Sequence, residues 1–477
     1  MTVPSPSFLG FALLAALVFN ISTRPWWRQT TLLVVNLLFL ASFSRAPMAF
    51  LPMAAFLAYG LCVLRVTRNN SAPRLFVGLV MLTILFFFWL KRYAFIPNFT
   101  FISFPYLAIG LSYVFFRMLH VIIDNHQGAI DEEVSTLSFL NYTLNFTSLI
   151  SGPIQLYQDY RRMETHCLPL NLAVAAEGLE RIVLGYFKVA VVSMVLSFVQ
   201  HDAMTALYNG QPLWSRLFDA ALAAAVYPVY LYFNFSGYVD VVIGAARFFG
   251  IELPENFDRP FSSQNFIAFW SRWHMTLSNW LRTYVYSPLM LFCMRRIPAP
   301  NLAPYISIVA YFATFFLVGL WHGPTTEFLF FGLLQGGGVA ANKLYQVIME
   351  DRLTKKGYRA LAANPLYRAF CRGLTFTWFA FTLLWFWSSW QEISGLYHSV
   401  GGMVAVFAWM AILAVSTVSL AALESMHGSV LELKWSGTPW VHSRYVRTAW
   451  ATALSVITLS VAVLLDSPAP DIVYKAF

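Results

Sequence analysis

Two histidines, each directly preceded by a tryptophan, stand out in a strongly apolar chain. Trp273-His274 lies in the segment FWSRWHMTLSNWLR, and Trp321-His322 lies in VGLWHGP. Imidazole is the side chain whose ordinary pKa lets it give or take a proton near neutral pH. Because an ionisable group is costly in apolar surroundings, it is interpreted first as a functional group. The pair predicts proton-transfer chemistry, provided that the fold brings the two histidines together.

Each histidine also has a purely structural interpretation. His322 follows an apolar run and precedes Gly323-Pro324, which places it at a helix end or break. There it is either functional or simply hydrogen-bonded beside an interfacial tryptophan. His274 is either functional or an ordinary polar residue of an interfacial helix. The other histidines fall in or near predicted loops, where most are expected to be solvated: His120, His126, His166, His201, His398, His427 and His442.

Asp240 is a third candidate, because its segment YFNFSGYVDVVIGAARFF is too apolar for an unpaired carboxylate. We expect its partner to be Arg247 or one of the two histidines. A buried ion pair that fixes helix packing explains Asp240 as well as a catalytic role does.

Other catalytic signatures are missing from the sequence. It has no GxSxG, HExxH or phosphate-binding glycine loop. The four cysteines (Cys62, Cys167, Cys293 and Cys371) are scattered, so neither a disulfide framework nor a metal site is predicted. If the protein is an enzyme, it uses an activated substrate supplied from outside, with histidine as the proton acceptor and no bound cofactor.

The composition is that of a polytopic membrane protein. Hydrophobic residues make up 58% of the 477 residues and charged residues 11%, whereas soluble proteins carry about 25% charged residues. The mean hydropathy is +0.61. The net charge of +9 comes from short Lys/Arg clusters between apolar runs, which is typical of cytoplasmic loops. We therefore expect a lipid bilayer, and no nucleic acid, around this chain.

The predicted fold class is all-α, because the apolar runs are too long and continuous for barrel strands. We expect one membrane domain over 1–477, with N-terminal helices in 1–135, a core with both histidines in 136–350, and C-terminal helices in 351–477. The first apolar run lacks a basic flank and is expected to be a retained helix. The predicted spans, about 11–12 in number, lie near 6–22, 30–44, 47–65, 75–95, 102–123, 173–200, 217–248, 303–320, 326–348, 373–390, 402–423 and 446–465.

Two stretches differ from these spans. In 249–298, aromatic residues recur at steps of three and four from Phe266 onward, which predicts an amphipathic interfacial helix. On that helix His274 would share a polar line with Ser278 and Arg282. In 137–162, the helix-breaking SGP predicts a re-entrant segment. Gly332 and Gly336 form a GxxxG motif, which indicates close helix packing.

Several motifs, in this order, resemble the membrane-bound O-acyltransferase family. They are SGPIQLY, NFSGYVD, PENF, FWxRWH and GLWHG, all within about 140–345. The resemblance is to the bacterial branch that modifies extracytoplasmic polysaccharides. It implies a funnel-like helical scaffold with His322 as the catalytic histidine and His274 as a second one. The residues expected to support them or to bind substrate are Asp240, Asn256, Arg272, Trp273, Ser278 and Trp321.

This resemblance implies a multi-pass protein of the bacterial inner membrane. It would transfer an acyl group from a cytoplasmic thioester such as acetyl-CoA, and acetyl is the acyl group that we expect. The acceptor would be a polysaccharide, reached through a secreted or periplasmic acyltransferase partner. Asp240 favours the acetylating members, whereas ELPENF and RWHMTLS favour D-alanyl transfer of the teichoic-acid type. A proton-coupled transporter and a scaffold of a secretion complex are the alternatives from other classes.

Overall fold

A computed structural model describes residues 3–69, 72–93, 96–97, 101–102, 104–165, 170–209, 212–432, 434–435, 438–439 and 443–465. His166, Cys167 and His442 lie outside these residues. Apart from a two-residue antiparallel ladder, β1 (Lys434–Trp435) with β2 (Thr438–Pro439), the described elements are helical. The predicted all-α class is confirmed.

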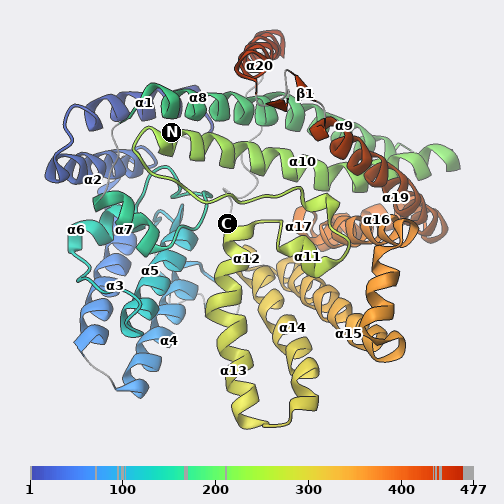
Figure 1. Cartoon of the computed structure of the whole chain (residues 1–477), viewed down its shortest axis with the longest axis horizontal. Coiled ribbons are helices and arrows are strands. Elements are labelled where there is room, and N and C mark those ends of the chain that lie inside the picture. Colours follow the sequence, from blue (N-terminus) through green and yellow to red (C-terminus); the bar gives the residue numbers. More distant parts are fainter. Residues whose placement is uncertain are drawn as a thin grey trace. The chain divides into compact units, whose positions relative to one another are not determined.

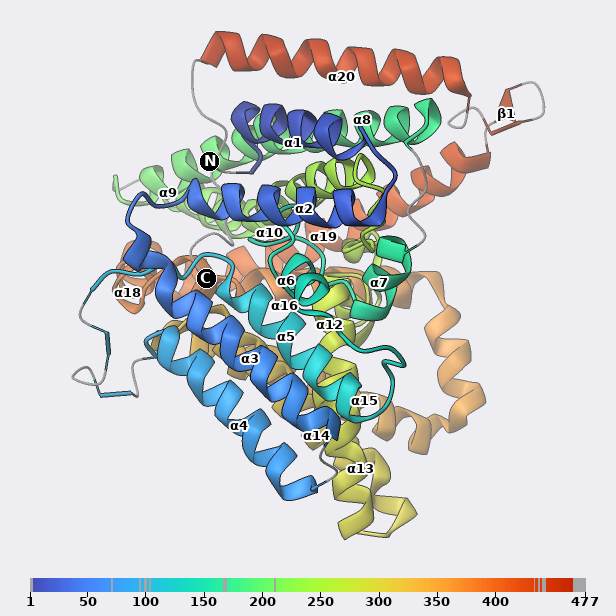
Figure 2. The ribbon, with the colours of Figure 1, turned by 90° about the vertical axis from the view of Figure 1, so that its left-hand side faces the viewer.

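The chain groups into two compact units, and α10 (Leu213–Arg247) contributes to both. The first unit takes residues 1–186 and 235–254 of the described chain. In Figure 2 its helices α3, α4 and α5 run side by side, in agreement with their mutual contacts. Its helices are α1 (Pro6–Phe19), α2 (Pro25–Ala41), α3 (Leu51–Asn69), α4 (Pro73–Leu90), α5 (Leu111–His126), α6 (Thr136–Thr143), α7 (Tyr157–Thr165) and α8 (Leu172–Phe187).

The second unit takes residues 187–234 and the described residues from 255 onward. It holds both candidate histidines, and α14 and α15 form a helical hairpin within it (Figure 1). Its helices are α9 (Met194–Leu207), α11 (Phe266–Trp270), α12 (Met275–Leu281), α13 (Ser287–Arg296), α14 (Ala303–His322), α15 (Thr326–Ala363), α16 (Pro365–Thr382), α17 (Leu384–Trp387), α18 (Trp390–Val400), α19 (Gly402–Glu432) and α20 (Arg444–Leu465). The predicted division at 135 and 350 stays a prediction.

Eight helical stretches of the described chain are long and apolar enough to cross a membrane. They are Pro47–Arg68, Pro73–Leu90, Leu172–Leu207, Leu213–Arg247, Pro300–His322, Pro365–Trp387, Gly402–Ser429 and Arg444–Leu464. Helices lie at the other four predicted spans, although 102–123 is helical only from Leu111. Of these helices, α1, α2 and α5 have only 14, 17 and 16 residues. The fourth, α15, is long but carries polar residues among its apolar ones. The eight stretches therefore fall short of the predicted 11–12.

Glycines set how closely α14 and α15 approach each other. A Cβ atom on Gly319 would lie 2.3 Å from the Cα atom of Gly332, and one on Gly336 would lie 2.6 Å from the carbonyl oxygen of Phe312. No real side chain fits at such distances, so only glycine allows this packing. The GxxxG prediction is confirmed, and the tight hairpin fixes the end of α14, where His322 lies.

We predict that Gly319→Ala destabilises the protein by about 1–3 kcal/mol, because the added methyl group must push α15 away. A matched control is Gly337→Ala in the same hairpin, where an added Cβ meets no described atom within 4 Å. Alanine favours the helix, so the control should unfold at the same temperature as the parent or a higher one. Thermal unfolding in detergent measures both. Equal unfolding temperatures for the two variants would contradict the close packing.

Candidate active site

His322 is the last residue of α14 and is almost fully buried, with 2% of its surface exposed. The helix ends there because Gly323 adopts an extended conformation and Pro324 follows. The imidazole lies against the aromatic rings of Phe386 and Phe331, with centroid distances of 4.9 and 5.7 Å. The predicted helix end is confirmed, and the site around His322 is aromatic and shielded.

His274 lies in a turn, and the prediction of one continuous helix from Phe266 is wrong. The helix α11 ends at Trp270, and α12 begins only at Met275. Between them, His274 adopts the left-handed conformation, with φ 45° and ψ 52°, which is strained for a residue with a side chain. His274 therefore does not share a helical polar line with Ser278 and Arg282. Its side chain is buried, with 1% exposed.

Asn256 holds this turn through its side chain and its backbone. Its Oδ1 atom accepts hydrogen bonds from the backbone N–H of Thr276 (3.2 Å), the Thr276 hydroxyl (2.9 Å) and His274 Nδ1 (3.2 Å). Its carbonyl oxygen accepts from the N–H of Met275 (2.9 Å). Asn256 is fully buried, so these bonds form where unsatisfied polar groups are most costly. They offset the strain at His274.

The same bonds assign the tautomer of His274. A backbone N–H can only donate, so the Asn256 atom that faces Thr276 N must be the oxygen. That oxygen can only accept, so Nδ1 of His274 carries the proton. The lone pair of the neutral ring is then on Nε2. Burial lowers the pKa of His274 to about 3, which keeps the ring neutral near physiological pH.

Trp321 links the two histidines. Its ring lies 4.6 Å from that of His322 and 6.1 Å from that of His274, centroid to centroid. The structure thus brings His274, Asn256, Trp321 and His322 into one buried cluster within the second unit.

Three other predicted site residues pack around the turn. Trp273 is buried among aromatic rings, including Phe257 at 5.2 Å and Phe379 at 5.0 Å. Arg272 donates from Nη1 to the Ser262 hydroxyl at 2.6 Å. The Ser278 hydroxyl donates to the carbonyl of Trp273 at 3.2 Å. The contacts of these residues support the shape of the turn.

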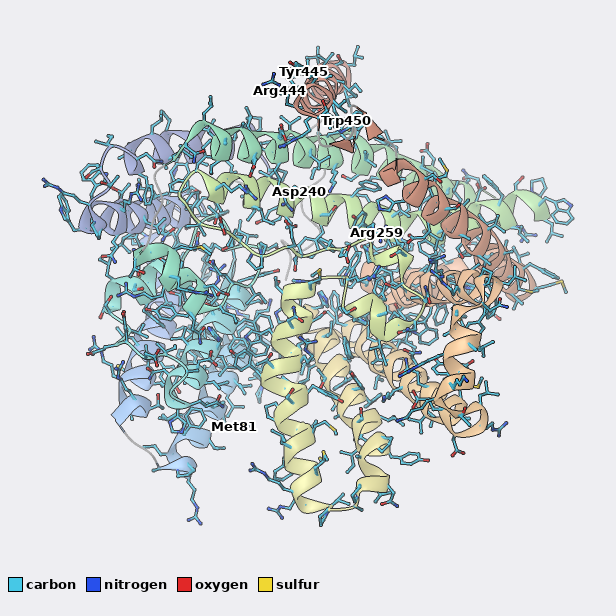
Figure 3. All side chains as sticks on the ribbon, in the orientation of Figure 1. Met81, Asp240, Arg259, Arg444, Tyr445 and Trp450 are labelled. Atoms are coloured by element: carbon cyan, nitrogen blue, oxygen red, sulfur yellow. The ribbon has the colours of Figure 1, made fainter. Side chains whose placement is uncertain are left out.

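Asp240 lies on α10 (Figure 3) and pairs with Arg181, whose Nε atom is 2.9 Å from its Oδ1 atom. The predicted partner Arg247 pairs with Glu177 instead. Both ion pairs belong to the first unit. The sequence separation of 59 residues between Arg181 and Asp240 explains why local spacing pointed to the wrong arginine.

His120 is an exception to the expectation that most of the remaining histidines are solvated. It lies on α5 with 1% of its surface exposed. Its Nε2 atom accepts the backbone N–H of Tyr157 at 2.8 Å, and its Nδ1 atom lies 3.3 Å from Asp124 Oδ2. The i,i+4 spacing of His120 and Asp124 was the available sequence signal.

The chain around the SGP motif is non-helical, as predicted, whereas its re-entrance stays a prediction. Buried Arg117 satisfies part of this backbone. Arg117 donates to the carbonyl oxygens of Tyr142, Thr143 and Ser148 at 3.3, 3.1 and 2.8 Å. Non-helical backbone is tolerated at such depth where protein groups bond to it. Among the described residues, no three His, Cys, Asp or Glu side chains gather as metal ligands.

Comparison with known proteins places this cluster in a family context. The chain is 28% identical over 275 residues to the teichoic acid D-alanyltransferase of Bacillus subtilis, which covers 56% of this chain and 67% of that protein. It is 33% identical over 240 residues to the probable alginate O-acetylase AlgI of Pseudomonas syringae, and this match covers 50% of this chain and 43% of that protein. It is also 33% identical over 214 residues to the peptidoglycan O-acetyltransferase of Helicobacter pylori, and this match covers 43% of this chain and 38% of that protein.

The matched segment thus spans less than half the length of the alginate and peptidoglycan relatives. Residues 81–386 match the family described as MBOAT, membrane-bound O-acyltransferase. This range is well over half of the chain and contains both histidines, Asn256 and Trp321. The predicted resemblance is confirmed, and this chain belongs to the membrane-bound O-acyltransferase family.

Proposed function

We propose that this protein transfers an acetyl group from a thioester donor on the cytoplasmic side of a bacterial inner membrane for O-acylation of an extracytoplasmic polysaccharide. The observation that carries the proposal is the buried cluster in which the Trp321 ring lies close to both His274 and His322. The names of the alginate and peptidoglycan relatives, both O-acetylating, support the acetyl group.

In the proposed step, His322 acts as the general base. Its imidazole takes the proton of the acceptor hydroxyl while the hydroxyl oxygen attacks the thioester carbonyl. The new C–O bond forms, the C–S bond breaks, and the leaving thiolate takes the proton back from His322. General-base catalysis of this kind contributes about 10² to 10⁴-fold. The aromatic shell around His322 excludes water, which would otherwise compete with the acceptor.

His274 has a more limited role in this proposal. With its proton on Nδ1 and its lone pair on Nε2, the neutral ring accepts a hydrogen bond through Nε2 and cannot donate one there. It therefore orients a donor group, either the acceptor hydroxyl or an amide N–H of the thioester carrier. It does not polarise the thioester carbonyl.

The acceptor hydroxyl belongs either to the polysaccharide or to a secreted or periplasmic partner that completes the transfer outside. We favour the partner, by analogy with the polysaccharide-modifying branch that the motifs resemble. The partner would carry the acyl group on one exposed hydroxyl and pass it on to the glycan.

D-alanyl transfer is the second candidate, supported by the length of the match to the teichoic acid relative. Mass spectrometry of the modified polymer separates the two candidates, since acetyl and D-alanyl groups differ in mass. Loss of D-alanyl groups in a strain lacking this protein, with acetyl groups unchanged, would overturn the acetyl assignment.

We predict that His322→Ala abolishes polymer acylation, with a loss of at least about 10²-fold, while the protein still accumulates in the membrane. The control is His398→Ala, which changes an exposed histidine on α18 and should leave acylation intact. Acyl content of the polymer and immunoblots of the membrane fraction measure both effects. Full acylation by a well-accumulated His322→Ala protein would refute the base assignment.

Asn256→Asp tests the neutral state of His274. A buried carboxylate in place of the amide attracts a proton onto His274 and raises its pKa. The Nε2 atom then donates, so we predict a fall in acylation of about 10-fold or more near neutral pH. Acylation rates across pH 6 to 9 should show a partial recovery at high pH, which a simple packing defect would not produce.

The matched control is Asn364→Asp, because Asn364 also caps a helix with its side chain but is exposed at the start of α16. It should leave the rate and its pH profile unchanged. Parental activity of Asn256→Asp at every pH would exclude the proposed role of the His274 tautomer.

The low pKa of His274 also predicts how stability depends on pH. In the unfolded chain its pKa returns to about 6.5, so below that pH the unfolded state takes up a proton that the folded state does not. The contribution of His274 to the free energy of unfolding is therefore fully present above about pH 7. It falls as the pH drops, by about 2 kcal/mol between pH 7 and pH 5. Thermal unfolding of His274→Gln should lose this part of the pH dependence, whereas His398→Gln should keep it. An unchanged pH dependence in His274→Gln would contradict the burial of a neutral ring.

A further inference from the structure

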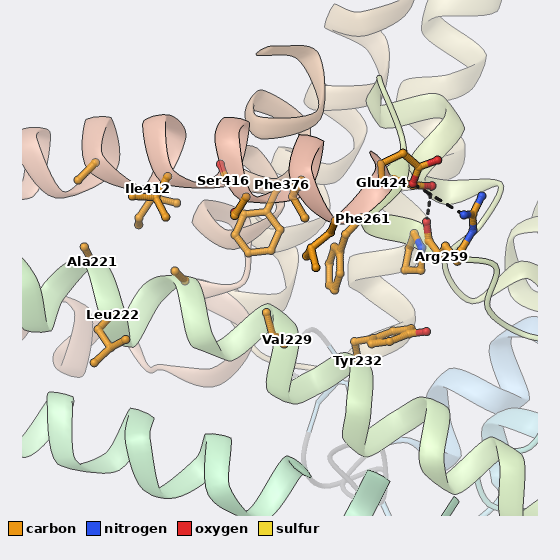
Figure 4. A pocket seen from close by; sticks show the side chains of 18 of the residues that line it. Ala221, Leu222, Val229, Tyr232, Arg259, Phe261, Phe376, Ile412, Ser416 and Glu424 are labelled. Atoms are coloured by element: carbon orange, nitrogen blue, oxygen red, sulfur yellow. Dashed lines mark hydrogen bonds and ion pairs between the residues drawn. The ribbon is translucent and has the colours of Figure 1, made fainter. Parts of the chain in front are cut away.

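The second unit contains a cavity of about 850 Å³ that the proposed acyl transfer does not use. It is formed by α10, α19, Phe376 and the turn 259–262. Figure 4 shows its side chains, with α10 on one side and α19 on the other. Its size is that of typical small-molecule sites, about 300–1,000 Å³.

The two ends of the cavity differ in chemistry. Ala221, Leu222 and Ile412 gather at one end, and Arg259 and Glu424 lie at the other (Figure 4). Arg259 Nη1 and Glu424 Oε2 are 3.8 Å apart. A ligand that fits this cavity is therefore amphipathic, with a long apolar part and a polar group at the Arg259 end.

The apolar part opens toward lipid. Phe218 on α10 and Val415 and Leu423 on α19 line the cavity and are 62%, 67% and 59% exposed. Both helices are among those long and apolar enough to span a membrane. Exposed apolar side chains on such helices contact acyl chains of the bilayer, so an acyl chain can enter from the side without crossing water.

The polar end is positively charged. Buried Arg372 donates from Nε to the carbonyl of Ser262, which also lines the cavity, and it interacts electrostatically with Arg259, Arg272 and Arg368 as well as Glu424. Three guanidinium groups thus lie around that of Arg372, together with the carboxylate of Glu424. Asp258 lies beside two of them, Arg259 and Arg272. Guanidinium groups bind phosphate through paired hydrogen bonds.

We propose that this cavity binds an anionic phospholipid, with one acyl chain between α10 and α19 and the phosphate at Arg259. The apolar opening selects a lipid over a soluble phosphate compound, and the excess of arginines selects a negative headgroup over a zwitterionic one.

This cavity contacts the turn that holds His274 through Phe261 and Ser262. Phe261 lines the cavity, meets Phe376 edge-to-face at 5.3 Å and lies 6.4 Å from Trp273, centroid to centroid. Arg272, the residue before Trp273, is bonded to the hydroxyl of Ser262 at 2.6 Å. A bound lipid therefore packs against the residues that hold His274 in place, as a structural lipid rather than as a substrate.

The test uses the full-length protein in nanodiscs of phosphatidylcholine. Trace phosphatidylglycerol with a diazirine on its acyl chain is compared with phosphatidylcholine carrying the same group. After illumination, we expect phosphatidylglycerol to label peptides of α10 and α19 roughly tenfold more than phosphatidylcholine, the difference that one charge-assisted contact produces. Arg259→Gln should lower phosphatidylglycerol labelling roughly tenfold, to the level of phosphatidylcholine. Ala221→Trp, which fills the apolar end, should lower labelling by both lipids.

Two matched controls remove a charge or add an indole elsewhere. They are Arg295→Gln at an exposed site of α13 and Ala453→Trp at an exposed site of α20, and neither should change the labelling. Equal labelling by the two lipids would overturn the proposed preference for an anionic headgroup. Unchanged labelling in both Arg259→Gln and Ala221→Trp would overturn the site, as would stronger labelling by a diazirine-bearing long-chain acyl-CoA, which would make the cavity a donor site.

Discussion

A single buried amide fixes the tautomer of His274, on which the proposed chemistry of the cluster depends. The Oδ1 atom of Asn256 accepts the backbone N–H of Thr276, which fixes the orientation of the amide and hence the proton on Nδ1 of His274. In an apolar interior such bonds cannot be exchanged for bonds to water, so the assignment holds wherever the turn is folded. The tautomer, the neutral charge and the direction of the ring all follow from this one acceptor, and the strain at His274 is tolerated because of it.

The second histidine is held by packing rather than by a hydrogen-bonded turn. His322 ends a helix whose position is set by backbone contact at Gly319 and Gly332. Backbone contact leaves little freedom to slide, because any shift brings side chains into collision. The Trp321 ring lies near both imidazoles, 6.1 Å from His274 and 4.6 Å from His322. It thereby joins a turn held by polar bonds to a helix end held by glycines.

The sequence predicted what depends on local pattern. Apolar runs predicted the helices, Gly323-Pro324 predicted the end at His322, and ordered motifs predicted the family. It failed at His274, because the aromatic spacing of three and four residues continues straight through the break. That break is caused by bonds to Asn256, 18 residues away, and long-range bonds leave no periodic trace. The partner of Asp240 was missed for the same reason.

The buried histidines of this chain also show how a structural role differs from a reactive one. At His120 both ring nitrogens serve the fold, since Nε2 accepts the N–H of Tyr157 and Nδ1 faces Asp124. Proton transfer there would break the bond that holds the start of α7. At His274 it is Nδ1 that anchors the ring, so in the proposed reaction the Nε2 atom of the neutral tautomer accepts a hydrogen bond without loss of the anchor. Burial alone does not distinguish the two residues. The atom that carries the structural bond does, and it places His274 beside His322 in the proposed reaction while excluding His120.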